Sequence, residues 1–305
     1  MSQFEKVVSI IKESNEKGLL EEHNEILTGY SGKKMVGMLQ RLSANLLNEN
    51  KCYLEVGVFQ GLTLLSVAKA ISNKGATAYG IDNFAYFDRD GKNFGIVKDR
   101  ISKLGLSNAK VINMDYEDAL ESISQQIEGK KIGVYFVDGP HDYRSQLVCL
   151  LLAMPHLADD AVIIVDDCNY RHVRQANRDF LIAHPEFKLV YQSYGKAHPL
   201  NLSGSDRKEA EEGWWNGVNV IVRDPENRIK QKFPETFRSR LLYENEHGIH
   251  TTKHPDVIVK LMGIFNVISG LFKTFFPAKA QITGKYKEMN TYSEDLPKNE
   301  FSILN

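Results

Sequence analysis

Acidic residues stand in or directly after four apolar, strand-like runs of this chain. Glu55 lies in the first run, Asp82 follows the second, Asp138 follows the third, and Asp166 and Asp167 follow the fourth. The carboxyl ends of parallel strands in an open α/β sheet line one crevice, so these carboxylates are expected to converge. Converging carboxylates repel one another, which raises a pKa or requires a cation. The pattern therefore indicates a site for a small molecule and a cation.

The elements that must position these residues alternate between β-rich and helical stretches from Cys52 to about Arg223, which is typical of βαβ units. Strands are expected around Leu54, Tyr79, Val111, Phe136 and Ile163, and then over residues 187–194 and 218–222. The last two runs lack a convincing crossover helix between them, which favours an antiparallel hairpin. The predicted fold class is α/β, a Rossmann-like α/β/α sandwich with a mostly parallel seven-stranded sheet and helical additions at both ends.

Three segments are predicted: an N-terminal helical cap at 1–48, a ligand-binding α/β domain at 49–224, and a C-terminal extension at 225–305. The extension contains an apolar helix at 257–276 and a polar tail from about residue 284. The broad apolar stripe of that helix favours a homo-oligomer interface or an active-site cover over membrane-surface binding. Lys260, Asn266 and Lys273 interrupt the segment, which disfavours a membrane span.

Composition narrows the class further. The chain has 305 residues, 42% of them hydrophobic and 25% charged, with a formal net charge of -1. These values are ordinary for a globular protein, and the near-zero charge removes the usual electrostatic argument for nucleic acid as the main partner. Charged residues near the N-terminus argue against a signal peptide, and the three cysteines show no paired spacing. A reduced, cytoplasmic location is predicted.

A glycine loop connects the first strand to the next helical run. It contains Gly57 and Gly61 but departs from the dinucleotide fingerprint GxGxxG, which disfavours NAD. Glycine there lets a ligand approach the backbone closely. In such a site, Glu55 would contact an amino group of the ligand and Asp82 its ribose hydroxyls. Asp115, after the third strand, would contact its adenine. The alternative, in which each acid only caps a following helix, stays open.

With these features the chain resembles the class I S-adenosylmethionine-dependent methyltransferases over roughly residues 50 to 225. The resemblance implies that Glu55, Gly57 and Gly61 form the loop on the methionine side of S-adenosylmethionine, with Thr63 contacting the carboxylate. It also implies that Asp82 binds the ribose and that Asp115 lies near the adenine.

Two acidic stretches, Asp138 to Tyr143 and Asp166 to Asn169, resemble those of metal-dependent O-methyltransferases of the catechol and macrolide-sugar types. The similarity implies that Asp138, Asp166 and Asp167 bind Mg²⁺ or another divalent cation, with Asn169 as an alternative to Asp167. Catechol-type enzymes have a lysine base three residues after their first metal aspartate. His141 stands there in this chain, as in the sugar-modifying relatives, and is the expected catalytic base.

The predicted function is a divalent-metal-assisted O-methyltransferase that acts on a hydroxyl of a sugar, a natural-product intermediate or a catechol-like molecule. A metal lowers the pKa of a coordinated hydroxyl, and a nearby imidazole accepts its proton. Two alternatives stay open: a metal-independent methyltransferase that uses His141 alone, and a non-enzymatic cofactor-binding interaction protein. The loop at 195–217, which contains His198, is expected to contact the acceptor. Trp214 and Trp215 within it are expected either to wall the substrate or to pack in the core.

Overall fold

The computed structural model describes residues 2–21, 26–85, 87, 88, 90–236 and 296–305, together with eight helical residues between 257 and 271. Residues 1–235 and 290–305 belong to one compact unit, which contains all the strands named below. The residues of the candidate site all lie in this unit.

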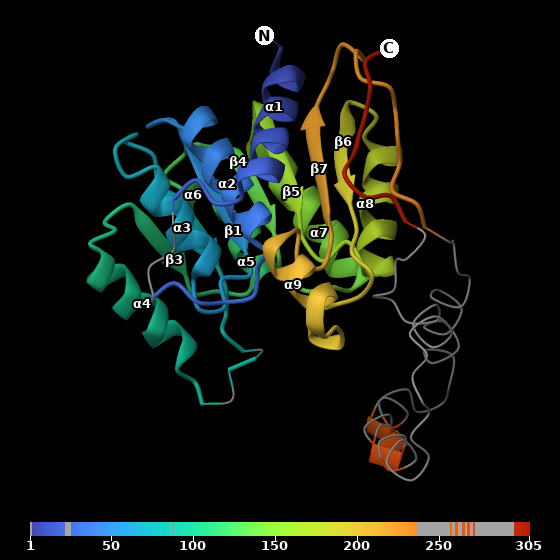
Figure 1. Cartoon of the computed structure of the whole chain (residues 1–305). Helices are drawn as coiled ribbons and strands as arrows, with labels where there is room; N and C mark the ends of the chain where they lie inside the picture. Colours follow the sequence, from blue (N-terminus) through green and yellow to red (C-terminus); the bar gives the residue numbers. More distant parts are fainter. Residues whose placement is uncertain are drawn as a thin grey trace. The chain divides into compact units, whose positions relative to one another are not determined.

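The unit is built around one mixed sheet with the strand order β3-β2-β1-β4-β5-β7-β6-β8. Its strands are β1 (Lys51–Val56), β2 (Ala78–Ile81), β3 (Ala109–Ile112), β4 (Lys131–Val137), β5 (Leu157–Val165), β6 (Phe187–Ser193), β7 (Val218–Arg223) and β8 (Glu300–Phe301). The pairs among β1 to β5 are parallel, whereas β7 pairs antiparallel with both β5 and β6. The arrow of β7 in Figure 1 points away from α9, so the parallel strands end near α9.

Helices cover both faces of the sheet (Figure 1). The described helices of eight or more residues are α1 (Gln3–Lys17), α2 (Lys33–Leu46), α3 (Leu62–Ala70), α4 (Asn93–Leu104), α7 (Tyr143–Ala153), α8 (Arg171–Ala183) and α9 (Gly204–Glu212). Shorter turns are α5 (Tyr116–Glu121), α6 (Ile123–Gln126), η1 (Met154–His156) and η2 (Pro199–Asn201). Several helices follow strands directly, as the βαβ pattern predicts.

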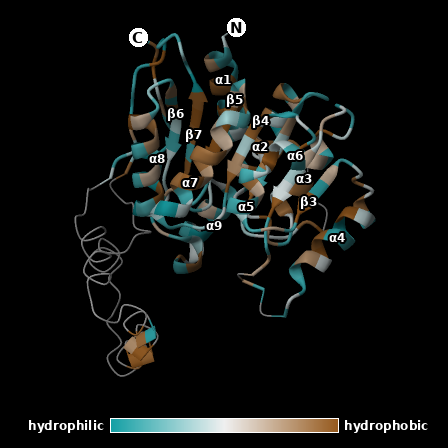
Figure 2. Cartoon of the chain, turned by 180° about the vertical axis from the view of Figure 1, so that it is seen from behind, coloured by the Kyte–Doolittle hydropathy of each residue, from teal (hydrophilic) through white to brown (hydrophobic). Residues whose placement is uncertain are grey.

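The two faces follow from the period of two along each strand. Val134 and Phe136 of β4 point into a hydrophobic cluster shared with α1, α2 and α3, whereas Tyr135 and Val137 point into a second cluster shared with α7 and α8. All four side chains are essentially inaccessible. Figure 2 shows the hydrophobic colour concentrated on the central strands. The result is the three-layer α/β/α sandwich that the sequence predicts.

Most strand predictions are confirmed, and one detail of the sheet is different. The hairpin of β6 and β7 is antiparallel as predicted, although α9 lies between the two strands. The sheet has an eighth strand, β8, which pairs antiparallel with β6. The predicted count of seven was therefore wrong. The reason is that a two-residue edge strand within a polar tail has no alternating apolar run that could identify it.

The N-terminal helices occupy the predicted cap region, and their apolar residues join the main core. Val7 and Ile11 of α1 and Met35 and Met38 of α2 are buried in the cluster that contains Phe136. Most of the predicted apolar helix at 257–276 lies outside the described residues. No helix within the described part of the chain has the length and apolar character that crossing a membrane requires.

Candidate functional site

The glycine loop, residues 57–61, leaves the end of β1 and starts α3. Gly57 has φ +93, and a Cβ atom there would lie 1.9 Å from the carbonyl oxygen of Asp138. Gly61 has φ +83 and stands at the N-cap of α3. Both positions need glycine, the first for space as well as for backbone conformation. The loop therefore packs against the backbone that carries Asp138.

Asp82, at the end of β2, holds the glycine loop in place. Its Oδ2 accepts hydrogen bonds from the backbone N–H groups of Val58 and Phe59 at 2.9 and 2.8 Å, and its Oδ1 accepts one from Phe84 at 2.7 Å. A carboxylate offers about four lone-pair sites, so three backbone bonds leave room for a further donor. The predicted ribose contact remains a prediction.

Glu55 and Thr63 meet beneath the loop. Glu55 is completely buried, and its carboxylate accepts hydrogen bonds from the Tyr53 hydroxyl at 2.7 Å and from the Thr63 hydroxyl at 3.2 Å. Burial raises the pKa of Glu55 to about 8, against the lowering effect of these hydrogen bonds. Asp115 is the N-cap of α5, where its side chain accepts from the backbone N–H of Glu117 at 2.9 Å. Its predicted place near the adenine remains a prediction beside this capping role.

The strand ends of β4 and β5 bring together Asp138, His141 and Asp167, here called the Asp–His group. One ligand atom from each of the three lies within 4.8 Å of the others. His141 Nε2 lies 2.8 Å from Asp167 Oδ2, and the imidazole stacks on the Tyr170 ring with centroids 5.3 Å apart. With Nε2–H donated to Asp167, Nδ1 is the ring nitrogen left to accept a proton.

Two of the predicted metal residues have other contacts. Asp166 is not one of the three clustered residues, and its Oδ1 accepts a hydrogen bond from the backbone N–H of Asp167 at 2.7 Å. The amide oxygen of Asn169 accepts from the backbone N–H of Gly195 at 3.0 Å. The structure thus places His141, predicted as the base, with Asp138 and Asp167, predicted as metal ligands.

Electrostatics separate these acids. Burial, with repulsion from Asp166 and Asp167, raises the pKa of Asp138 well above its ordinary value, and burial beside Asp167 also raises the pKa of Asp166. Burial acts in the same direction on Asp167, yet the charge and hydrogen bond of His141 lower the pKa of Asp167 overall. Burial opposes protonation of His141, but Asp167 raises the pKa of the imidazole overall. Asp167 is therefore the stable anion, and His141 is a stronger base than a free imidazole.

The prediction missed Asn216. Its side chain is fully buried, its Nδ2 donates to Asp167 Oδ1, and its backbone carbonyl accepts from the Asn169 N–H at 2.8 Å. The sequence shows only an Asn-Gly pair directly before a strand. Such a pair predicts a turn and does not predict a hydrogen bond to a distant carboxylate.

Aromatic side chains extend from the glycine loop toward the 195–217 loop. The Tyr30 ring lies 5.3 Å from the Phe59 ring and 6.0 Å from the Trp215 ring, and the His198 ring meets Trp215 edge-on at 6.3 Å. His198 Nδ1 accepts the backbone N–H of Leu200, so a neutral His198 carries its proton on Nε2. Burial lowers the pKa of His198 overall, although the charge of Asp167 acts to raise it.

The residues present fit a divalent cation in part. Two carboxylates and an imidazole can ligate one ion, and the amide oxygen of Asn216 is buried beside them with no hydrogen-bond partner among the described residues. Carboxylate and amide oxygens suit Mg²⁺ and Mn²⁺, whereas the imidazole suits later transition metals. Asp138 and Asp167 are the residues that would hold it, because His141 as a ligand would lose the ring nitrogen that accepts a proton.

Comparison with known proteins agrees with this fold. Residues 54–168 match a protein-family model described as a methyltransferase domain. That match covers the glycine loop, Asp82 and the Asp–His group. This unit therefore has the α/β Rossmann-like methyltransferase fold, and residues 54–168 are similar to a methyltransferase domain.

Solved structures with similar folds differ in what they act on. An O-methyltransferase from Bacillus cereus in complex with S-adenosylhomocysteine is 18% identical, with 73% of this chain and 91% of that chain covered and a TM-score of 0.46. An rRNA methylase from Streptococcus thermophilus is 13% identical, with 62% and 95% covered and a TM-score of 0.43. CalS11, a calicheamicin methyltransferase, is 14% identical, with 58% and 84% covered and a TM-score of 0.42. No curated protein matches the chain. Likenesses this distant do not identify an acceptor.

Proposed function

We propose that the domain transfers the methyl group of S-adenosylmethionine to a hydroxyl oxygen of a small molecule, with His141 as the general base and Asp167 as its orienting partner. The observation that carries this proposal is the 2.8 Å contact between His141 Nε2 and Asp167 Oδ2 at the carboxyl ends of the strands. A hydroxyl needs such a base because its own pKa is far above neutral, whereas an amine acceptor is already nucleophilic once it is uncharged.

The cofactor half of the site is the glycine loop with Glu55, Thr63 and Asp82. We infer that Asp82 binds the ribose hydroxyls while it keeps its backbone bonds, and that the N-terminus of α3 faces the methionine carboxylate. An anion is favoured at a helix N-terminus, where backbone N–H groups are unsatisfied. Asp115 keeps its proposed place near the adenine, since its carboxylate accepts a hydrogen bond at 3.3 Å from Nδ2 of Asn83, the residue after Asp82.

In the acceptor half, His141 removes the hydroxyl proton at Nδ1 while Asp167 stabilises the resulting imidazolium. The methyl group then passes from the sulfonium to the oxygen, the sulfur–carbon bond breaks, and S-adenosylhomocysteine leaves with the sulfur electron pair. Alignment of the oxygen with the methyl is the other main contribution of the protein. The aromatic wall of Trp215 and Tyr30 is suited to a sugar ring or a flat acceptor.

Mg²⁺ or another divalent cation, held by Asp138 and Asp167, would lower the pKa of a coordinated hydroxyl, and His141 would stay off the ion as the base. A metal-free enzyme is the second candidate. The observation that favours it is that Asp167 already orients His141, as the aspartate of a hydrolytic triad orients its histidine. Asp138 separates the two candidates because only the first requires its carboxylate.

The test is methyl transfer from labelled S-adenosylmethionine to a panel of sugar diols and catechols. We expect turnover by the wild type and a loss of about 10²–10⁴-fold in His141→Gln, the range for a general base. A loss of wild-type turnover after chelation would support the metal-assisted form if Mg²⁺ or Mn²⁺ restores the turnover and if chelation has no effect on Asp138→Asn. Full turnover after chelation would support the metal-free form, and unchanged turnover in His141→Gln would contradict the proposed base.

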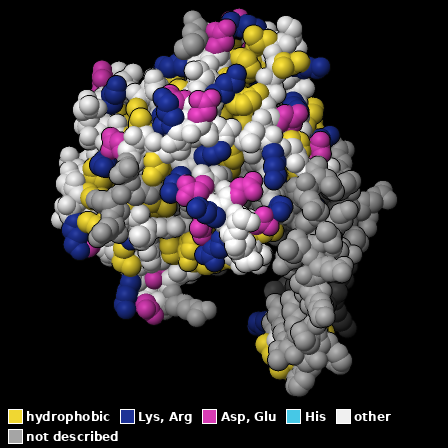
Figure 3. Space-filling view, viewed as in Figure 1, with side chains coloured by type: hydrophobic (Ala, Val, Ile, Leu, Met, Phe, Trp, Pro, Cys, Tyr) yellow, Lys and Arg dark blue, Asp and Glu magenta, His cyan; other side chains and the backbone are white. Residues whose placement is uncertain are grey.

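Mixed charge on the face shown in Figure 3, where Lys and Arg alternate with Asp and Glu, agrees with a small acceptor. A nucleic-acid substrate would favour a broad basic surface. The proposed cytoplasmic location and the proposed homo-oligomer through the 257–276 helix rest on the sequence alone.

A further inference from the structure

We propose that Asn299, in the C-terminal segment, is a positioning residue for the Asp–His group. It acts on the turn formed by Trp214, Trp215, Asn216 and Gly217, here called the Trp turn. This inference rests on the proposed function only in assuming that the Asp–His group takes part in methyl transfer. The contacts that carry it run from Asn299 to Trp214 and from Asn216 to Asp167.

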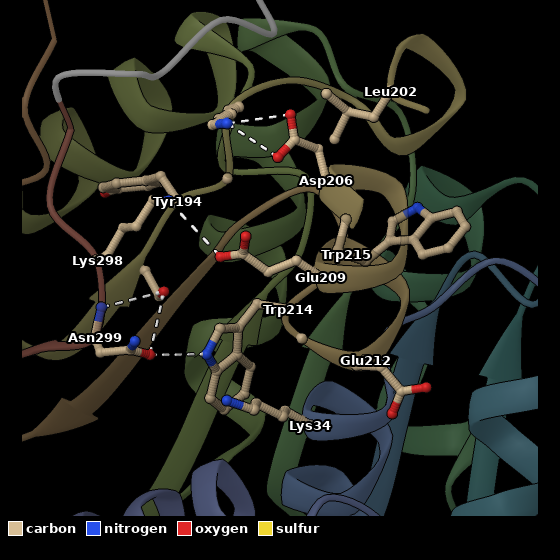
Figure 4. A pocket seen from close by; sticks show the side chains of 15 residues that line it. Lys34, Tyr194, Leu202, Asp206, Glu209, Glu212, Trp214, Trp215, Lys298 and Asn299 are labelled. Atoms are coloured by element: carbon tan, nitrogen blue, oxygen red, sulfur yellow. Dashed lines mark hydrogen bonds and ion pairs between the residues drawn. The ribbon is translucent and has the colours of Figure 1, made fainter. Parts of the chain in front are cut away.

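The first contact lies at a small cavity of about 200 Å³ on the β6 side of the sheet (Figure 4). The carbonyl oxygen of the Asn299 side chain accepts from Trp214 Nε1 at 3.2 Å, from the Tyr191 hydroxyl at 2.6 Å and from Asn15 Nδ2 at 3.1 Å. Indole N–H is only a donor, so the atom that faces it must be the amide oxygen. One oxygen thus joins α1, β6 and the Trp turn.

Neighbouring contacts fix Asn299 itself. Its backbone N–H donates to Ser193 Oγ at 3.2 Å, and the next residues form β8 against β6. Asn15 is oriented by Lys34 Nζ, which donates to its Oδ1 at 2.8 Å and leaves its Nδ2 to face Asn299. Asn299 has φ +49, a conformation that asparagine, aspartate and glycine tolerate better than other residues. The residue type therefore suits both the backbone and the acceptor role.

The other end of the Trp turn reaches the site. Asn216 Nδ2 donates to Asp167 Oδ1, and the carbonyls of Asn216 and Gly217 accept from the N–H groups of Asn169 and Cys168. Trp215, between the two anchors, has φ +55, which a tryptophan does not adopt without support from both sides. In Figure 4 the Trp214 indole turns toward Asn299, and that of Trp215 points away from it.

These contacts have a geometric consequence. Trp214 and Asn216 are two residues apart, so a displacement of the first moves the amide that holds Asp167, and Asp167 in turn orients His141. Another hydrogen bond could hold the Trp turn without Asn299. The carbonyl of Gly213, directly before the turn, accepts from the backbone N–H of Lys34 at 3.1 Å. If that bond alone sufficed, removal of the Asn299 oxygen would leave the Asp–His group unchanged.

The chain has only two tryptophans, both in the Trp turn, so ¹H–¹⁵N spectra of the full chain report the turn through two indole signals. We would compare the wild type with Asn299→Gly, which keeps the backbone conformation but removes the oxygen, and with Asn299→Asp, which keeps both. Trp214→Phe is a second variant that removes the indole donor and keeps an aromatic ring. The imidazole signals of His141 are followed in the same samples.

We expect Asn299→Gly and Trp214→Phe to shift the Trp215 indole and the His141 ring signals, and Asn299→Asp to retain the wild-type positions. S-adenosylhomocysteine affinity, measured by calorimetry, should change less than about twofold, because the cofactor half lies elsewhere. Unchanged His141 signals in Asn299→Gly and Trp214→Phe would overturn the proposal. A wild type without S-adenosylhomocysteine binding would instead contradict the proposed function, while the spectra would still decide the positioning role.

Discussion

The two halves of the site are built in different ways. In the cofactor half, Asp82 binds backbone N–H groups of a loop that is continuous in sequence with β1 and α3. In the acceptor half, side chains bind side chains. His141 and Asn216 both contact Asp167, and these three residues come from three separate segments. The comparison teaches that the cofactor half depends on backbone shape, whereas the acceptor half depends on the mutual placement of distant segments.

The largest effect is expected where the halves touch. Gly57→Ala should abolish S-adenosylhomocysteine binding and lower stability by more than about 3 kcal/mol, because the new Cβ would meet the Asp138 carbonyl at 1.9 Å in addition to the strain of φ +93. Gly105→Ala is the matched control, since Gly105 has φ +63 with nothing within 4 Å. Calorimetry and thermal unfolding measure both. Equal effects of the two substitutions would contradict the close approach.

Within the acceptor half, Asp167→Asn should lower turnover by about 10²–10⁴-fold, because the imidazolium of His141 loses its anionic partner. S-adenosylhomocysteine affinity should stay within about twofold. The control is Asp99→Asn, which removes only an exposed ion pair with Lys103. A comparable loss of affinity and turnover in Asp167→Asn would mean that the halves are not separate.

Within the cofactor half, Asp82→Asn should weaken S-adenosylhomocysteine binding at least tenfold. An amide cannot accept all three backbone bonds, and each buried N–H left unpaired costs about 1–3 kcal/mol. Asp88→Asn is a suitable control, because Asp88 accepts the backbone N–H groups of Lys92 and Asn93 outside the glycine loop. It should lower stability without a change in affinity. Calorimetry that finds the same affinity loss in both variants would remove the special role of Asp82.

The smallest effect concerns stability against pH in the ligand-free protein. Burial raises the pKa of Glu55 from 4.5 to about 8, so the unfolded chain releases this proton first and stability is lost as pH rises from about 4.5 to 8. Glu55→Gln should therefore gain a few degrees in melting temperature over the wild type at pH 8.5 and little at pH 5.

Glu117→Gln is the opposite-sign control, because Arg144 and Tyr116 lower the pKa of Glu117 to about 2 and its charge stabilises the fold above about pH 4.5. That variant should melt lower than the wild type at pH 8.5. A Glu55→Gln variant that melts lower at pH 8.5 as well would show that Glu55 is stabilising as an anion.

The contrast between the halves also explains what the sequence could predict. The glycine loop, Asp82 and the strand ends follow local patterns, so the fold and the convergence of Asp138 with Asp167 were predictable. Asn216 was not, because its contact depends on the return of β7 beside β5. The acceptor role of Asn299 was also hidden, since it is created by β8, a two-residue strand in a polar tail.

The separation of the two halves is tested by calorimetric titration of the chelator-stripped full chain with S-adenosylhomocysteine, for the wild type and for Asp167→Asn. We predict one binding site in both proteins, with affinities within about twofold of each other, because the cofactor half does not use the Asp167 side chain. Absence of binding to the wild type, with and without Mg²⁺, would contradict the assignment of this site to S-adenosylmethionine.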